Sequence, residues 1–297
     1  MKTFRQALQG DRFTLTAEFS EGGPHPAGQS PSQIIELSEA LSGLVDGIVV
    51  AQDHHLSATA MANLLIRNGT DPVVKLNCRD RNRIALESDL LGLRALGVSS
   101  LVLDEQGDAI DDTEATAKPV FDVSAPELTA MAQAINEEAW SDGHHEFLVG
   151  SSATVQNLVS DRDKVPLLMR SAEGSRFLQT RLCLDVGLLR TFMQKLVEMK
   201  LLWNYSVLVT LAPLPSAEAA RWLLANRLGA VIPESLICKL ESASDATREG
   251  IELCAELLKE VAIIPGVSGV NLLSLGDPGP VKEVIEISGL KAALSPT

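Results

Sequence analysis

A single carboxylate, Glu18, stands inside an apolar, strand-like segment that runs from Phe13 to Phe19. Burial between apolar neighbours favours the neutral form of a carboxyl group and suits it to general-acid chemistry. Arg181 occupies a similar apolar segment, where a charge is costly unless it has a partner. Two arrangements stay open at this point. Glu18 and Arg181 form a facing pair that serves the structure, or both face a ligand.

Three arginines, Arg79, Arg81 and Arg83, follow an apolar run within the sequence Cys-Arg-Asp-Arg-Asn-Arg. Guanidinium groups hold phosphate or carboxylate through paired hydrogen bonds, so this cluster is a candidate anion site. In the alternative interpretation the arginines pair with carboxylates of the next loop, and Asn82 caps the helix that follows.

Short β-branched runs alternate along the chain with longer segments of helical periodicity, as in parallel strands joined by crossover helices. The expected strands are Phe13–Phe19, Gly47–Val50, Pro72–Leu76, Ser99–Leu103, Phe147–Gly150, Phe177–Leu182, Ser206–Thr210 and Val267–Leu272. The expected helices are Pro31–Leu41, Ala58–Arg67, Arg83–Leu96, Ala125–Glu138, Asp185–Met199, Ala217–Asn226, Pro233–Leu240, Asp245–Val261 and Val281–Ile287. This order predicts an α/β protein, a single-domain (β/α)8 TIM barrel over residues 1–297. No GxGxxG sequence follows the first strand, which argues against a Rossmann fold.

The barrel prediction gives a rule for choosing functional residues, because the working side chains of such barrels project from the carboxyl ends of the strands. Glu18 lies at the end of the first expected strand, and Lys75 and Asn77 lie at the end of the third. The acidic segment from Asp104 to Glu114 is expected to form a loop over the barrel mouth.

Composition excludes several classes of protein. A formal net charge of -14 argues against nucleic-acid binding, which needs a basic face. No apolar run approaches the roughly 20 residues that span a bilayer, and the first ten residues lack an apolar core of signal-peptide length, so we expect a cytoplasmic protein with no membrane contact. The four cysteines and five histidines show no zinc spacing, so no metal site is expected.

Several motifs occur together in one order. Cys78–Leu86 leads into Ser88–Gly92; Gly107-Asp108 and Ala117–Asp122 follow, and then Gln179-Thr180 before Asp185, Ile232–Glu234, Glu249–Ile251 and Gly269-Val270. On these residues the chain resembles the methylenetetrahydrofolate reductase family, in the form with a Cys-Arg-Asp-Arg-Asn signature, from about residue 13 to 290. The resemblance implies a flavin-containing barrel that reduces 5,10-methylenetetrahydrofolate to 5-methyltetrahydrofolate with electrons from NAD(P)H.

The resemblance also implies roles for residues at strand ends and in the loops that follow. Glu18 matches the family's catalytic glutamate, the general acid that helps to open the five-membered ring of the folate. The implied folate contacts are Asp108, Gln179, Arg181 and Leu272. The implied contacts of the cofactor, FAD, are Lys75, Asn77, Arg79, Asp108, Gly150 and Arg170.

The chain departs from the family at several of these positions. Members usually have histidine or glutamine at Lys75, threonine at Asn77 and glutamine at Arg181. The turn that ends at Asp108 is longer and more acidic here, and Ser151-Ser152-Ala153 stands where several members place an aromatic residue against the flavin.

Three interpretations therefore stay open. The leading one is a reductase that uses NAD(P)H through FAD. In the second, hydride passes directly from the nicotinamide to the folate. In the third, the chain is a non-catalytic or regulatory folate-binding homologue. The sequence leaves open a homo-oligomer or a partner subunit.

Overall fold

Eight parallel strands close into a barrel in the computed structural model of the chain, which describes residues 3–10, 12–20, 31–51, 56–107, 118–137, 146–158 and 173–290. The strands are β1 (Thr14–Ser20), β2 (Gly47–Ala51), β3 (Pro72–Asn77), β4 (Ser100–Asp104), β5 (Leu148–Ala153), β6 (Phe177–Leu182), β7 (Ser206–Leu211) and β8 (Val267–Leu275). Each strand pairs with the next, and β1 pairs with β8 from Thr14↔Gly269 to Ser20↔Leu275. The predicted (β/α)8 barrel is confirmed.

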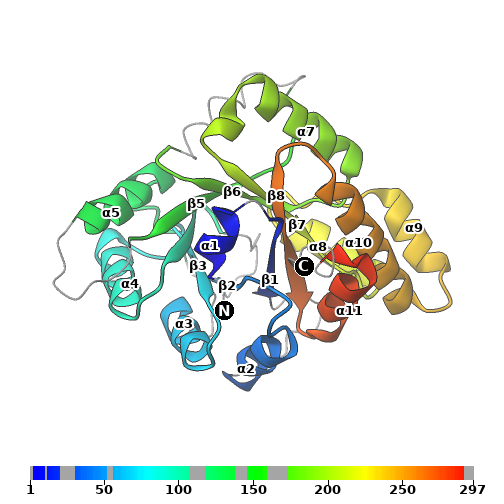
Figure 1. The fold of residues 1–297 in the computed structure, drawn as a ribbon, viewed down its shortest axis with the longest axis horizontal. Coiled ribbons are helices and arrows are strands. Elements are labelled where there is room, and N and C mark those ends of the chain that lie inside the picture. Colours follow the sequence, from blue (N-terminus) through cyan, green and yellow to red (C-terminus); the bar gives the residue numbers. More distant parts are fainter. Residues whose placement is uncertain are drawn as a thin grey trace.

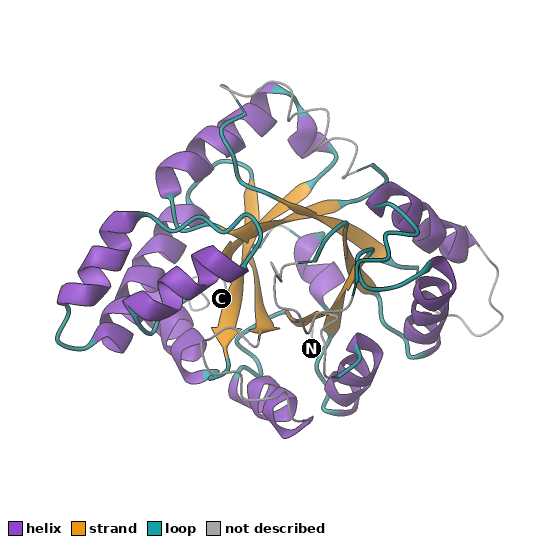
Figure 2. Ribbon diagram, turned by 180° about the vertical axis from the view of Figure 1, so that it is seen from behind, coloured by secondary structure: helices purple, strands orange, loops and turns teal. Residues whose placement is uncertain are grey.

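Helices cover the outside of the barrel (Figures 1 and 2). They are α2 (Pro31–Ala40), α3 (Ala58–Arg67), α4 (Arg83–Ala95), α5 (Ala125–Glu137), α7 (Val186–Glu198), α8 (Ala217–Asn226), α9 (Glu234–Ser242), α10 (Ala246–Ala262) and α11 (Gly279–Ser288), with a 3-10 turn, η1 (Leu201–Trp203). Their apolar faces and the outward side chains of the strands form one large core. Side chains such as Asn82, Asp185 and Asp245 cap the first turns of their helices.

A short helix that the sequence did not predict, α1 (Phe4–Leu8), packs at the opening of the barrel formed by the amino ends of the strands (Figure 1). Phe4 and Leu8 join a second apolar cluster with inward-facing residues of six strands, and the rings of Phe4 and Phe177 meet edge to face at 5.3 Å. The backbone N–H of Phe4 donates to Asp71 Oδ2 at 2.7 Å. This end of the barrel is therefore filled mainly with apolar side chains.

Candidate functional site

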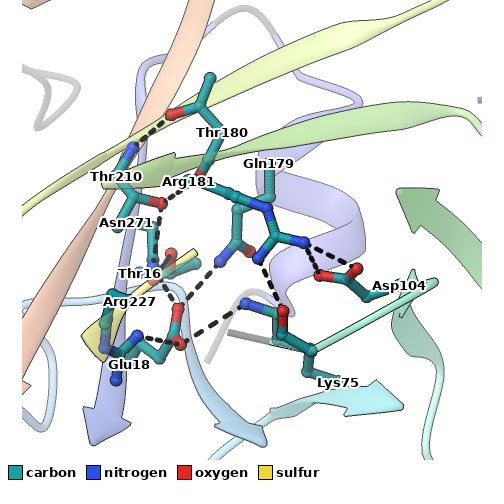
Figure 3. Close-up of polar contacts among 11 residues, drawn as sticks. Thr16, Glu18, Lys75, Asp104, Gln179, Thr180, Arg181, Thr210, Arg227 and Asn271 are labelled. Atoms are coloured by element: carbon teal, nitrogen blue, oxygen red, sulfur yellow. Dashed lines mark hydrogen bonds and ion pairs between the residues drawn. The ribbon is translucent and has the colours of Figure 1, made fainter. Parts of the chain in front are cut away.

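The carboxylate of Glu18 lies at the carboxyl end of β1 inside the barrel, with 2% of the residue exposed. Its Oε2 atom accepts two hydrogen bonds, from Gln179 Nε2 on β6 at 2.9 Å and from Asn271 Nδ2 on β8 at 2.7 Å (Figure 3). Two neutral amides on strands far apart in the sequence thus hold one oxygen of the carboxylate.

Two cations approach the other oxygen. Lys75 Nζ on β3 lies 3.7 Å from Glu18 Oε1, and one guanidinium nitrogen of Arg227, just after α8, lies 3.9 Å from it (Figure 3). Lys75 is 7% exposed, so water screens its attraction to the carboxylate only weakly. The apolar surroundings expected for Glu18 are wrong, because cations and amide donors surround the group.

The amide of Asn271 has a fixed orientation. Thr16 Oγ1 donates to Asn271 Oδ1 at 2.9 Å, which turns Nδ2 toward Glu18. Thr210 lies beside Asn271 and is itself fixed, because its hydroxyl donates to the backbone carbonyl of Thr180 at 2.6 Å. Glu18 is therefore held in place by partners that have partners of their own, as in preorganised active sites.

Arg181 pairs with Asp104 and not with Glu18, so the facing pair, one of the two arrangements that the sequence left open, does not form. One guanidinium nitrogen of Arg181, Nη2, donates to both carboxylate oxygens of Asp104 at the end of β4, at 2.9 Å each, and the other, Nη1, donates to the carbonyl of Gly107 at 2.9 Å (Figure 3). Asp104 is 3% exposed and Arg181 is 9% exposed. Asp104, one of the acidic residues of the long turn, is thus neutralised by Arg181, the position at which the resemblance leads to an expected glutamine.

The arginine cluster of the signature segment is engaged with carboxylates of the protein. Arg79 pairs with Asp80 at 2.8 Å, Arg81 with Asp89 at 3.2 Å and Arg83 with Glu127 at 3.4 Å. The Asn82 side chain accepts from the backbone N–H of Ala85 at 3.0 Å and caps α4. Of the two interpretations left open by the sequence, the structure supports the second, in which the segment shapes the turn into α4.

The remaining predicted residues are scattered. The Asn77 side chain accepts from the backbone N–H groups of Arg79 and Asp80, so it holds the same turn. Leu272 is fully buried in the outer core, and strand alternation places it on the opposite face of β8 from Asn271. Gly150 lies against the ring of Phe177, deeper in the barrel than the site. Asp108 and Arg170 lie outside the described residues.

These contacts bear on flavin binding. The side chains of Lys75, Asn77 and Arg79 have protein partners, and the ring of Phe177 fills the space where a side chain at Gly150 would lie. To bind the phosphates or ring of FAD, the described residues assigned to it would have to exchange these protein contacts for contacts with the cofactor. Flavin binding stays a prediction, and its other assigned contacts, Asp108 and Arg170, are among the residues not described.

Sequence reasoning missed three members of the site. Asn271 falls inside the eighth expected strand and Asp104 directly follows the fourth, but only their geometry shows that they hold Glu18 and Arg181. A polar residue inside an apolar strand was the available signal for Asn271. Arg227 follows a helix rather than a strand, so the strand-end rule gave no signal for it.

Neither a metal site nor a membrane span is found in the part of the chain that the structure describes. Nowhere in it do three or more potential metal ligands among His, Cys, Asp and Glu gather in a group that could hold an ion. None of its helices has the length and apolar character needed to cross a membrane.

Comparisons with known proteins agree with the barrel fold. The family model described as methylenetetrahydrofolate reductase matches residues 6–289. Among solved structures, an uncharacterized protein from Clostridium thermocellum that binds two copies of 5-methyl-5,6,7,8-tetrahydrofolic acid is similar, with a TM-score of 0.65, 15% identity and 96% of each chain covered. A long-chain alkane monooxygenase follows with a TM-score of 0.56, 10% identity and coverage of 97% of this chain and 93% of that one. No curated protein matches the sequence. At these identities the two structures show the fold alone, but the family model covers nearly the whole chain, which therefore belongs to the methylenetetrahydrofolate reductase family.

Proposed function

We propose that the protein binds a reduced folate at the carboxyl end of the barrel and reduces 5,10-methylenetetrahydrofolate to 5-methyltetrahydrofolate. The observation that carries the proposal is the position of Glu18. Its carboxylate sits inside the barrel at the end of β1, held through Oε2 by Gln179 and Asn271. Family membership over residues 6–289 supports the same activity.

The reaction needs one proton and one hydride. The proton goes to the ring nitrogen whose bond to the methylene carbon breaks, and the resulting iminium carbon accepts a hydride that comes from reduced nicotinamide. Glu18 is the group that transfers the proton. The ammonium of Lys75, 3.7 Å from Oε1, is close enough to exchange a proton with Glu18 through small movements or one water molecule.

The electron donor in this proposal is NAD(P)H, and FAD is the carrier that the family implies. FAD would accept hydride from the nicotinamide and deliver it to the folate. The absorption spectrum of the purified protein tests this part separately. A flavin spectrum supports FAD as carrier, whereas a colourless protein that oxidises NAD(P)H with methylenetetrahydrofolate supports direct transfer.

The test of the proposal is Glu18→Gln, which keeps the size of the side chain and removes the transferable proton. We expect NAD(P)H oxidation with methylenetetrahydrofolate to fall by about 10²–10⁴-fold, with the affinity for 5-methyltetrahydrofolate close to that of the unmodified protein. The control is Glu39→Gln, the same change at an exposed position of α2, which should alter neither quantity. Unchanged turnover in Glu18→Gln would contradict the role of Glu18.

A second candidate function is folate binding without turnover. It is favoured by the network around Glu18, in which cations and amides already surround the carboxylate, and by the similar clostridial protein, which binds 5-methyltetrahydrofolate. The test uses the unmodified protein and measures oxidation of NADH and NADPH with 5-methyltetrahydrofolate and with 5,10-methylenetetrahydrofolate. Binding of 5-methyltetrahydrofolate without oxidation of either nucleotide would support this candidate and contradict the first.

A further inference from the structure

Three exposed apolar side chains gather at the amino end of the barrel, opposite the end that holds Glu18. Val197 lies near the end of α7, Trp203 lies in η1 and is 81% exposed, and Ile263 directly follows α10 and is 72% exposed. Because η1 leads into β7 and the turn after α10 leads into β8, both segments stand at the amino ends of strands. Single exposed apolar residues are common, but a contiguous group of them marks a surface that another molecule covers.

The two segments that carry these side chains are in contact. A Cβ atom at Gly266 would overlap Leu202 Cδ1 and would lie 3.2 Å from Met193 Cε, so the turn after α10 packs against η1 and α7 (Figure 1). Arg190 of α7 and Glu260 of α10 also approach to 4.0 Å. The exposed and half-buried apolar residues of this surface, called the amino-end patch, are Val197, Leu202, Trp203, Ile263 and Pro265.

The turn that presents Trp203 has a backbone conformation that its sequence does not favour. Lys200 follows the end of α7 with a φ of 60° and a ψ of 22°, in the left-handed region where glycine is usual at this position. Its ammonium nitrogen lies 5.4 Å from the centre of the Trp203 ring, within the range of a cation–π contact. The lysine thus helps to hold the ring in its exposed position. Backbone strain of this kind gathers at functional sites.

The charges around the amino-end patch decide which partner fits it. The exposed charged residues within four positions of its apolar residues are two glutamates and two lysines, Glu198, Lys200, Lys259 and Glu260. The whole chain has a formal net charge of -14, so two copies repel each other least where the local charge is balanced, as it is here. A two-fold axis would also bring lysines of one copy to glutamates of the other. A strongly charged partner, such as a nucleic acid, would instead need a rim of the opposite sign.

We propose that the amino-end patch is the contact surface of a two-fold symmetric homodimer of this chain. Trp203 and Ile263 form the apolar centre of the interface, and the lysines and glutamates form its polar rim, as in other specific protein interfaces. This arrangement keeps the carboxyl ends of both barrels, where Glu18 lies, outside the interface. The inference does not depend on the proposed reductase activity.

Analytical ultracentrifugation of the full chain over a wide range of protein concentration tests the interface. We expect the unmodified protein to form a particle of twice the chain mass of 31.8 kDa. Trp203→Gln should raise the dissociation constant of the dimer by about 30-fold or more, and Ile263→Gln by about 10-fold, as for residues at the centre of an interface. The control is Ile84→Gln, the same change at a similarly exposed residue of α4, which should leave the dissociation constant unchanged.

Thermal unfolding gives a second measurement of the same contact. Because dimerisation stabilises the folded chain by mass action, the Tm of the unmodified protein should rise with protein concentration, and that of Trp203→Gln should rise less. Far-UV circular dichroism checks that each variant is folded. A monomeric unmodified protein would overturn the proposal and leave the patch to a different protein. A dimer that neither Trp203→Gln nor Ile263→Gln weakens would also overturn it, as would equal weakening by Ile84→Gln.

Discussion

At the scale of single residues, the site of this protein is defined by how its charges are distributed. Glu18 has two cations within 4 Å of one oxygen and two amides on the other. Arg181 on β6 and Asp104 on β4 neutralise each other. Two basic residues at which the chain departs from the expected family pattern, Lys75 and Arg181, each lie within 4 Å of a carboxylate of this chain. Arg181 and Asp104 form a pair of opposite charges, whereas Glu18 has both Lys75 and Arg227 beside it, so these five side chains include one more cation than carboxylate.

The Arg181–Asp104 pair yields a prediction about stability. Arg181→Gln restores the family's usual residue but leaves the Asp104 carboxylate buried without its cation, so we expect a loss of about 3–5 kcal/mol in the free energy of unfolding. Urea denaturation monitored by circular dichroism measures it. The double variant Asp104→Asn with Arg181→Gln should recover most of the loss. Arg190→Gln breaks the exposed pair with Glu260 and serves as control, with an expected cost of about 1 kcal/mol or less. Equal losses in Arg181→Gln and Arg190→Gln would contradict the importance of the buried pair.

The four thiols should differ in reactivity. Burial raises the pKa of Cys78, helped by the nearby carboxylates of Glu105 and Asp104, and raises that of Cys183, each to about 12; burial also raises the pKa of Cys254. A raised pKa keeps these groups as unreactive thiols at mildly alkaline pH. Cys238 is exposed. We expect one thiol of the folded protein to react quickly with Ellman's reagent and all four after unfolding. Rapid reaction of a folded Cys238→Ser variant would show that one of the buried thiols is accessible.

At the scale of elements, the strands were predictable because each begins with or contains a short buried apolar run, and most predicted ends coincide with the observed ones or differ by one residue. It was harder to predict which face of the sheet each residue of a strand occupies. Choosing Leu272 rather than Asn271 as a ligand contact placed the site on the wrong face of β8, although strand alternation and the polar character of Asn271 favoured the latter. Helix α1 has five residues, too few for a periodic pattern, and its position depends on Phe4 packing against distant Phe177. The partners of Glu18 and Arg181 depend on the order of strands around the barrel and on side-chain reach, which local patterns do not encode.

The contact between β5 and β6 below the site can be tested through Gly150. A Cβ atom there would overlap Cζ of Phe177, whose ring is fixed in the cluster with Phe4. We expect Gly150→Ala to lower the free energy of unfolding by about 1–3 kcal/mol through overpacking. Gly92→Ala is the matched control, since a Cβ in that helix would meet only Thr59 Cγ2 at 3.9 Å, and it should stabilise the protein by about 0.5–1 kcal/mol. Adding Phe177→Leu to Gly150→Ala should recover part of the loss. The explanation fails if Gly150→Ala is as stable as Gly92→Ala.

At the scale of the whole molecule, the barrel is closed by its first and last strands, which pair over seven residues each. A closed sheet has no exposed edge, so the strands nearest the chain ends share the protection of the central ones. The polar site lies across this closure, because Glu18 on β1 accepts from Asn271 on β8 and Thr16 on β1 donates to the same asparagine. A change that separates β1 from β8 would therefore also break the hydrogen bond that Glu18 accepts from Asn271.

This closure predicts how the protein opens. Backbone amides of β1 and β8 should exchange with solvent only in the global unfolding step, at the same urea dependence as those of β3 and β4, since separating either strand exposes a buried ladder. Hydrogen exchange followed by mass spectrometry across a urea series measures this, with peptides that cover the turn between α9 and α10, where Ser244 and Asp245 are exposed, as a fast-exchanging reference. Asn271→Leu should then lower the protection of β1 and β8 together with that of β3 and β4, because it removes a donor to a buried carboxylate while the barrel stays cooperative. Exchange of β1 and β8 at clearly lower urea than β3 and β4 in the unmodified protein would mean that the barrel opens locally between its first and last strands, and that Glu18 loses its partner Asn271 before the rest of the fold unfolds.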